Sequence, residues 1–201
     1  IKKYDPTTVV RFELCEDYWR WRNERTPSSF SLVYVAQYPA NPASIFGHMF
    51  LRMDKTPPLM AMTVAYFASL SGEDGFFKYT WKGLTGGYSG HFLLDRYYAQ
   101  VSLYASLEKR DMWEYRLNLT PDQIELLTAH LWEILNAGNT DYYFLDENCA
   151  YQVLGLIRAV VPGVGLDRKR INLYATPTDV LKNFVDAGLI KDKTFRPSIH
   201  R

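Results

Sequence analysis

The chain has 201 residues, 47% of them hydrophobic, which is enough to bury the core of one domain. Its formal net charge of +1 gives no basic field of the kind that binds nucleic acid, and two cysteines are too few for a disulfide framework or a cysteine-based zinc site. No stretch approaches the roughly 18 to 20 apolar residues of a membrane span. We expect one domain over residues 1–201, and the residues indicate neither a metal nor an organic cofactor.

The first third of the chain predicts a helix followed by strands. Residues 5–24 follow an Asp-Pro start and carry an irregular apolar stripe, which predicts an N-terminal helical segment. Runs of aromatic and β-branched residues then predict strands over 30–36, 48–53 and 59–66, with proline-containing loops between them. These strands are expected to form an antiparallel meander.

A glycine-rich stretch over residues 71–91 predicts a long ordered loop, which in a compact domain is typical of a lid or a binding loop. Its second half carries Trp81, Tyr88 and His91, which we expect to contact an acyl chain or a head group of a substrate. The alternative is a loop that packs on its own aromatic side chains. The next segment, residues 97–106, is ambiguous between helix and strand.

The second half of the chain predicts one further strand and two helices with clear start signals. Residues 111–119 alternate apolar and polar side chains, as a half-buried strand does. The helix starts lie at Thr120 and Thr176, each followed directly by proline, and the helices end at Gly138 and Gly188. Together with the meander, these elements predict an α+β domain in which an antiparallel sheet packs against helices.

Cys149 is predicted to begin a further, buried helix. Asn148 is a natural N-cap, and apolar residues repeat at helical spacing from Cys149 until Pro162. Free N–H groups and the helix dipole at this end favour a thiolate, and backbone N–H groups or the Asn148 amide are candidates for an oxyanion hole. A lone cysteine in an apolar helix is also typical of an inert core residue, so both interpretations stand at this point.

His48 is the candidate base for this thiol. It begins a predicted strand directly after Gly47, a residue that allows close backbone approach. A histidine on a sheet that faces a helix N-terminus would take the thiol proton and leave an ion pair. Ser44 either orients the imidazole or closes the loop before it, and a satisfied polar residue at a strand end is the alternative for His48 itself.

Four segments, in this order along the chain, resemble the Lnb-type N-terminal periplasmic domain family of bacteria. The first, Pro42-Ala43-Ser44-Ile45-Phe46-Gly47-His48-Met49-Phe50-Leu51-Arg52, is similar to the family's Pro-x-Ser-x-Phe-Gly-His-x-x-Leu-Arg signature. The other three are residues 82–88, 108–115 and 142–151. The resemblance covers a core of about residues 28–185.

The resemblance implies a circularly permuted papain-like thiol fold, related to NlpC-type peptidases and the lecithin–retinol acyltransferase group. Histidine precedes cysteine in that order, so the resemblance makes Cys149 the nucleophile and His48 its base. The third, orienting residue of such folds lies on the strand after the histidine. Thr63 and Tyr66 are the polar residues there, and neither is an acid or an amide.

The function implied by the resemblance is a cysteine-dependent acyltransferase or hydrolase that works through a thioester acyl-enzyme. Its substrates would be phospholipid or lipoprotein, its location the bacterial periplasm or cell envelope, with membrane proximity and no nucleic acid. A cell-wall peptidase of the same fold and a non-catalytic binding domain remain alternatives. Arg110, with Glu108 and Glu114, either binds a substrate head group or belongs to an internal ion-pair network.

Overall fold

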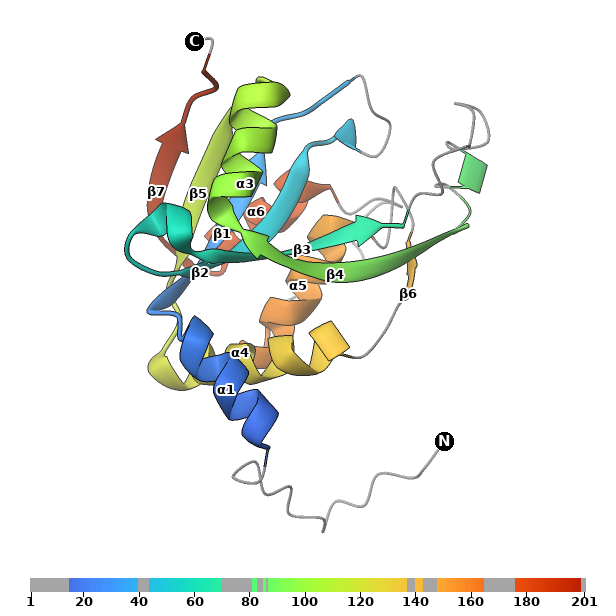
Figure 1. Ribbon diagram of the computed structural model, residues 1–201. Coiled ribbons are helices and arrows are strands. Elements are labelled where there is room, and N and C mark those ends of the chain that lie inside the picture. The colour runs from blue at the N-terminus through green and yellow to red at the C-terminus, as the bar shows by residue number, and fades with distance from the viewer. Residues whose placement is uncertain are drawn as a thin grey trace.

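A seven-stranded antiparallel sheet forms the centre of the computed structural model, which describes residues 15–39, 44–69, 81–82, 85, 87–136, 140–142, 148–164 and 176–199 (Figure 1). The strand order is β6-β4-β3-β2-β1-β5-β7. Helices accompany the sheet, so the chain has the α+β architecture that its sequence predicted. No helix within the described ranges is long and apolar enough to cross a membrane.

The strands confirm the predicted meander and extend it. They are β1(Ser29–Val35), β2(His48–Asp54), β3(Met62–Ala68), β4(Tyr88–Arg96), β5(Met112–Leu117), β6(Thr140–Tyr142) and β7(Ile190–Arg196). Strands β1 to β4 pair antiparallel in chain order. The third strand begins later than predicted because a short 3₁₀ turn, η3(Pro58–Met60), precedes it. Strand β4 begins within the stretch 71–91 that was predicted as a loop, and residues 71–80, 83–84 and 86 of that stretch lie outside the described residues.

The helices follow the predicted start signals. They are α1(Glu16–Arg25), α3(Tyr97–Val101), the π-helical turn η4(Ser102–Leu107), α4(Pro121–Asn136), α5(Cys149–Val160) and α6(Pro177–Asp186). Thr176 and Asp179 form a complete capping box at the start of α6. The predicted N-terminal helix is seen as α1, and residues 5–14 of that prediction lie outside the described residues. The ambiguous segment 97–106 is helical.

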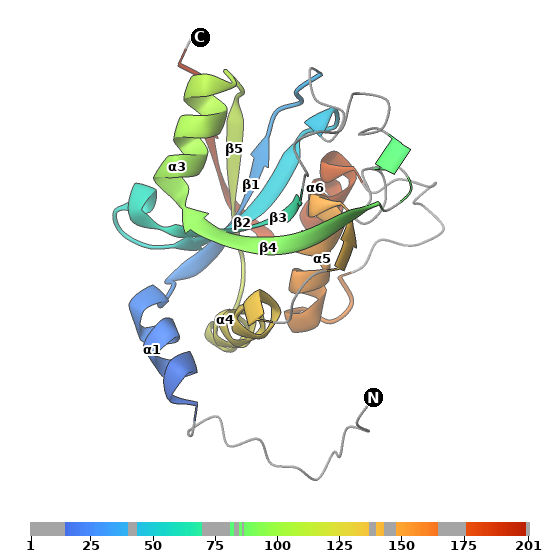
Figure 2. The same ribbon diagram turned by 45° about the vertical axis from the view of Figure 1, so that its right-hand side comes forward.

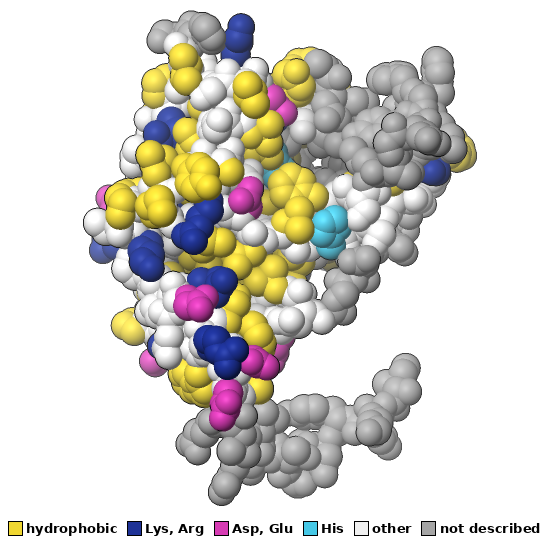
Figure 3. Space-filling view, in the orientation of Figure 1, with side chains coloured by type: hydrophobic (Ala, Val, Ile, Leu, Met, Phe, Trp, Pro, Cys, Tyr) yellow, Lys and Arg dark blue, Asp and Glu magenta, His cyan; other side chains and the backbone are white. Residues whose placement is uncertain are grey.

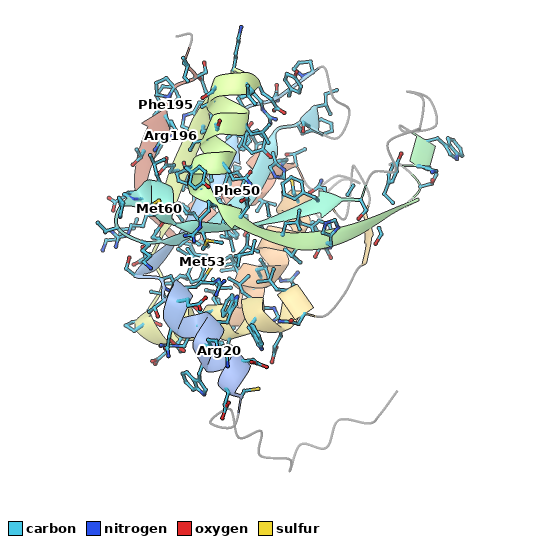
Figure 4. The ribbon with its side chains drawn as sticks, in the orientation of Figure 1. Arg20, Phe50, Met53, Met60, Phe195 and Arg196 are labelled. Atoms are coloured by element: carbon cyan, nitrogen blue, oxygen red, sulfur yellow. The ribbon has the colours of Figure 1, made fainter. Side chains whose placement is uncertain are left out.

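Helices cover both faces of the sheet (Figures 1 and 2). Met53 of β2 lies in a cluster with apolar residues of α4, α5 and α6, whereas Phe50 lies in a second cluster with Tyr97 and Tyr104 of α3 and η4 (Figure 4). Because side chains alternate along a strand, β2 is buried on both faces. The strand that begins with His48 therefore lies between the two cores and contributes side chains to both.

Two separate polar networks hold the charged residues near the sheet. Glu114 of β5 accepts hydrogen bonds from Tyr97, at 2.6 Å, and Arg196, at 3.1 Å, and pairs with Arg52. Arg110 instead pairs with Glu108. The predicted group of Glu108, Arg110 and Glu114 thus splits, and only the Glu114 network ties β2, β5 and β7 together.

The outer side of α3 and η4 carries apolar side chains at the surface, where Figure 3 shows hydrophobic groups gathered. Tyr98 is 53% exposed and Leu107 is 73% exposed. The inner side of the same segment is buried, because Tyr97 and Tyr104 point into the core. The position of η4 against β2 is consequently fixed by its inward aromatic residues.

Candidate active site

Cys149 lies at the first position of α5, as its sequence context predicted. The side chain of Asn148 caps this helix, and its Oδ1 accepts hydrogen bonds from the N–H groups of Ala150, at 3.0 Å, and Tyr151, at 3.2 Å. The thiol is only 3% exposed and packs in a small cluster with Tyr66 and Tyr88. The cap therefore fixes the sulfur at a buried helix start.

The electrostatics of this thiol differ from the sequence prediction. Burial raises the pKa of Cys149 to about 11, although the backbone N–H groups of Met49, Ala150 and Cys149 donate to the sulfur and the charge of Arg110 favours the thiolate. The helix terminus supplies only favourable contributions of this kind. Desolvation outweighs them, so the prediction of a lowered thiol pKa is wrong for the resting protein, in which Cys149 is a neutral thiol.

His48 is the first residue of β2. It directly precedes Met49, whose backbone N–H donates to the Cys149 sulfur. Its ring packs against Phe67, Tyr104 and Phe50, with centroid separations of 5.3, 5.7 and 5.9 Å. Burial, with a smaller contribution from the charge of Arg110, lowers the pKa of His48 to about 3. The imidazole is therefore neutral at physiological pH. The predicted ion pair is not the resting state, although a neutral imidazole is the form that accepts a proton.

Gly47 explains how His48 reaches this position. Its φ is +96°, and a Cβ there would lie 2.7 Å from the carbonyl oxygen of Val35 and 2.8 Å from the Tyr34 ring. Only glycine fits such a backbone position without strain. The backbone carbonyl of Ser44 closes the same turn by accepting the N–H of Gly47 at 2.9 Å. This bond does not involve the Ser44 hydroxyl, whose role toward the imidazole stays a prediction.

Of the two candidates for the third position, the structure brings only Tyr66 to the thiol. Tyr66 is 1% exposed and belongs to the cluster that contains Cys149. Thr63 pairs with Arg52, four residues along β2 from His48, which corresponds to about 13 Å at roughly 3.3 Å per residue. Its hydroxyl donates to the carbonyl oxygen of Asp95 at 3.1 Å. Thr63 is thus a sheet residue at a distance from the site.

The predicted substrate-contacting residues separate in the same way. Tyr88 is 4% exposed and lies beside Cys149 and Tyr66. Trp81, by contrast, is 70% exposed, and His91 on β4 forms a hydrogen bond of 2.9 Å between its Nδ1 and Ser69. Only Tyr88 of these three residues packs with the thiol.

Arg110 lies closer to the thiol and imidazole than sequence reasoning anticipated. Its Nε donates to the carbonyl oxygen of Ala36 and its Nη1 to Glu108, each at 2.7 Å. Its charge acts on both His48 and Cys149. The signal that could have found it is its place within residues 108–115, one of the four segments that carry the family resemblance.

A neutral, buried His48 makes stability depend on pH. The unfolded chain takes up the His48 proton near the ordinary pKa of 6.5, whereas the folded chain does so near 3. Between these values acid favours unfolding, so this residue lowers the free energy of unfolding by up to about 1.4 kcal/mol for each pH unit of acidification. Urea unfolding at pH 7 and pH 4.5 should therefore show a larger acid loss for the wild type than for His48→Phe.

That comparison isolates one group, because other acid-sensitive residues, such as Glu114, are present in both proteins. Equal losses of stability in the wild type and in His48→Phe would contradict a buried, neutral imidazole at this position.

No three His, Cys, Asp or Glu side chains gather as metal ligands in the part of the chain that the structure describes. The sequence profile of the Lnb N-terminal periplasmic domain family matches residues 17–187. Among solved structures, the crystal structure of the type VI secretion system effector TseH is 9% identical, with a TM-score of 0.49, and the match covers 85% of this chain and 93% of that one. None of the curated proteins matches the chain.

Proposed function

We propose that this chain, which belongs to the Lnb N-terminal periplasmic domain family, is a cysteine-dependent acyltransferase or hydrolase of the periplasm. The family is one of periplasmic domains, which places the chain in that compartment. One observation carries the proposed chemistry. The buried sulfur at the start of α5 accepts the N–H of Met49, so the thiol at a helix N-terminus lies against the start of the strand whose first residue is the neutral His48.

The proposed reaction begins from a neutral pair. As the Cys149 sulfur attacks the substrate carbonyl, its proton passes to Nε2 of His48 and the new C–S bond places negative charge on the carbonyl oxygen. Backbone N–H groups at the helix start, which include that of Cys149 itself, stabilise this oxyanion. His48 then returns the proton to the leaving group as its bond to the acyl carbon breaks, which leaves a thioester.

The second half of the reaction regenerates the thiol. Water or an amine attacks the thioester while His48 removes its proton, and the proton returns to the departing sulfur. Water makes the protein a hydrolase and an amine makes it an acyltransferase. The order of His48 and Cys149 along the chain supports the permuted papain-like form of this chemistry.

The surroundings of the thiol favour an acyl substrate over a polar peptide. Tyr66 and Tyr88 pack on Cys149, and the partly buried Ala68 and Phe92 pack on this cluster. Such apolar, aromatic surroundings suit a fatty acyl chain, which supports phospholipid or lipoprotein as substrate. A cell-wall peptidase remains the second candidate, supported by the fold relationship alone. The high pKa of Cys149 supports the third, a binding domain with an inert thiol.

Replacing Cys149 with alanine should reduce turnover of activated acyl esters to the uncatalysed background. The reason is that Cys149 is the described thiol that lies at a capped helix start against the beginning of β2. p-Nitrophenyl esters with acyl chains of increasing length provide the measurement. Cys15→Ala is the matched control, since Cys15 is free and exposed and should leave turnover unchanged.

Full activity in Cys149→Ala would exclude the proposed nucleophile. A comparison of phospholipid micelles with cell-wall stem peptides as substrates then separates the first candidate from the second. Absence of turnover with every substrate class, in a folded protein, would favour the inert binding domain.

A further inference from the structure

Two buried nitrogen atoms at the candidate site have no hydrogen-bond partner among the described residues. They are Nε2 of His48 and Nη2 of Arg110. Arg110 is 3% exposed and His48 is 7% exposed. A buried polar atom without a partner costs free energy, so a position that retains two of them needs a reason beyond stability. The free Nε2 is explained by a base that awaits a proton, and the free Nη2 calls for its own explanation.

The backbone before Arg110 is unusual in the same place. The segment η4 is a π-helical turn, in which the N–H of Glu108 donates to the carbonyl oxygen of Leu103 at 2.9 Å. Lys109 then has a φ of +55°, in the left-handed region that non-glycine residues rarely adopt. The N–H of Arg110 returns to the carbonyl oxygen of Tyr104 at 2.9 Å. π-Helical turns and strained residues concentrate at functional sites, and here they direct Arg110 into the core.

Tyr104 connects this cation to both members of the pair. The guanidinium carbon of Arg110 lies 5.1 Å from the centroid of the Tyr104 ring, and the His48 ring lies 5.7 Å from it. A negative charge on Cys149 also raises the pKa of Tyr104. Arg110 and His48 thus both pack on one aromatic ring contributed by the π-helical turn, and Cys149 lies within electrostatic range of it.

We propose that Arg110 is the third polar member of this site, a positioning residue whose buried guanidinium packs on the Tyr104 ring beside His48 and stabilises negative charge on Cys149. The proposal rests on the function proposed above. In such folds the third residue that orients the imidazole is expected to be an acid or an amide. Here we assign the third position to a cation. The proton still moves from the Cys149 sulfur to Nε2 of His48. The charge of Arg110 acts on both the donor and the acceptor of this proton.

The charged and titratable groups that face this cluster come from four elements and the segments beside them. Glu108 is the one carboxylate paired with Arg110 in the described structure, and its side chain is 26% exposed. Among the described residues, the other titratable groups near the pair are Lys82, whose Nζ lies 5.5 Å from the centroid of the Tyr88 ring, and the phenols of Tyr34, Tyr38, Tyr66, Tyr88 and Tyr104. Because phenols are neutral at physiological pH, Glu108 is the group whose removal should strengthen the field of Arg110.

The test is the pH dependence of Cys149 alkylation by iodoacetamide, followed by mass spectrometry, with the His48 ring titrated by NMR in the same proteins. Arg110→Gln should raise the pH of half-maximal alkylation by about one unit or more, as expected when an opposite charge near a titrating group is lost. The midpoint of His48 should also rise. Arg110→Lys keeps the charge and should stay near the wild-type midpoints, and Glu108→Gln should shift alkylation to lower pH.

If Arg110 has only a structural role, the variants should show a different set of alkylation midpoints. Lysine could not reproduce the planar fork that bonds Ala36 and Glu108, so Arg110→Lys would then behave like Arg110→Gln, and Glu108→Gln would shift nothing downward. That pattern would overturn the proposal, as would a wild-type alkylation profile in Arg110→Gln. Should Arg110→Gln fail to fold, Arg110→Lys and Glu108→Gln still decide the question.

Substrate turnover distinguishes a failure of the proposed function from a failure of the role of Arg110. If the folded wild type turns over no acyl ester, phospholipid or stem peptide, the site is not a thiol enzyme, whatever Arg110 does to the titration of Cys149. If the wild type is active and the Arg110 and Glu108 variants share its alkylation and His48 profiles, only the role of Arg110 is wrong.

Discussion

His48→Phe is expected to lower kcat/KM for activated acyl esters by about a hundredfold to ten-thousandfold while the protein stays folded, the usual contribution of a general base. Phenylalanine keeps the aromatic packing against Phe67, Tyr104 and Phe50 but cannot accept a proton. Steady-state kinetics, with near-ultraviolet circular dichroism as the folding check, provides the measurement. His91→Phe is the matched control, because His91 bonds Ser69 away from the thiol and its replacement should leave kcat/KM within about twofold of the wild type.

The pH dependence of the wild type sharpens this prediction. Since the pKa of His48 is about 3 and that of Cys149 about 11, the neutral pair persists across the range between them. The value of kcat/KM should therefore be flat from about pH 5 to pH 9. A bell-shaped profile with limbs inside that range would indicate a preformed ion pair instead. Unchanged kinetics in His48→Phe would remove the imidazole from the mechanism altogether.

Gly90→Ala is expected to destabilise the protein by about 1 to 3 kcal/mol or more, the range for overpacking a tight core. Gly90 of β4 lies opposite Ala68, diagonal to Tyr66 on β3. A Cβ on Gly90 would lie 2.0 Å from the Tyr66 hydroxyl oxygen and 2.3 Å from its Cζ. The phenol has no room to yield, because Tyr66 is 1% exposed and packs on Cys149 and Phe92. We therefore expect Gly90→Ala to lose stability and acyl-ester turnover together.

The control for this prediction lies in the helix of the nucleophile. A Cβ on Gly155 of α5 meets no heavy atom within 4 Å. Gly155→Ala should raise the free energy of unfolding by about 0.5 to 1 kcal/mol, as alanine does in a helix interior. In a double-mutant cycle, Tyr66→Leu should recover part of the stability that Gly90→Ala loses. Additive effects of the two substitutions would show that the ring of Tyr66 is not what glycine accommodates.

The parts of the fold that local sequence patterns specify were predictable. Strand β5 and helices α4 and α6 follow from apolar periodicity and from caps that involve residues only three apart. Strand β7 was not predicted, because it is an edge strand whose side chains are mostly exposed and carry no apolar alternation. Strand β4 was not predicted, because Gly90 made its first residues read as a loop. Gly90 is required there by Tyr66 on the neighbouring strand.

In the candidate site, too, the features set by neighbouring residues in the sequence were predictable, and those set by tertiary contacts were not. The helix start at Cys149, its Asn148 cap and the glycine before His48 are local features, and the sequence showed them. The state of the thiol was not predictable, because its pKa depends on burial by residues from other elements. Arg110 was assigned to a head group or a network because the π-helical turn that directs it inward has no simple sequence pattern.

In the proposed mechanism, Cys149 carries the acyl group during turnover. The most direct test is intact-mass spectrometry of the protein, quenched in acid during turnover of a p-nitrophenyl ester, followed by peptide mapping. We expect one added acyl group, on Cys149, which hydroxylamine releases as it does a thioester and which is absent from Cys149→Ala. An active protein that carries the acyl group on another residue, or that never carries one, would contradict it.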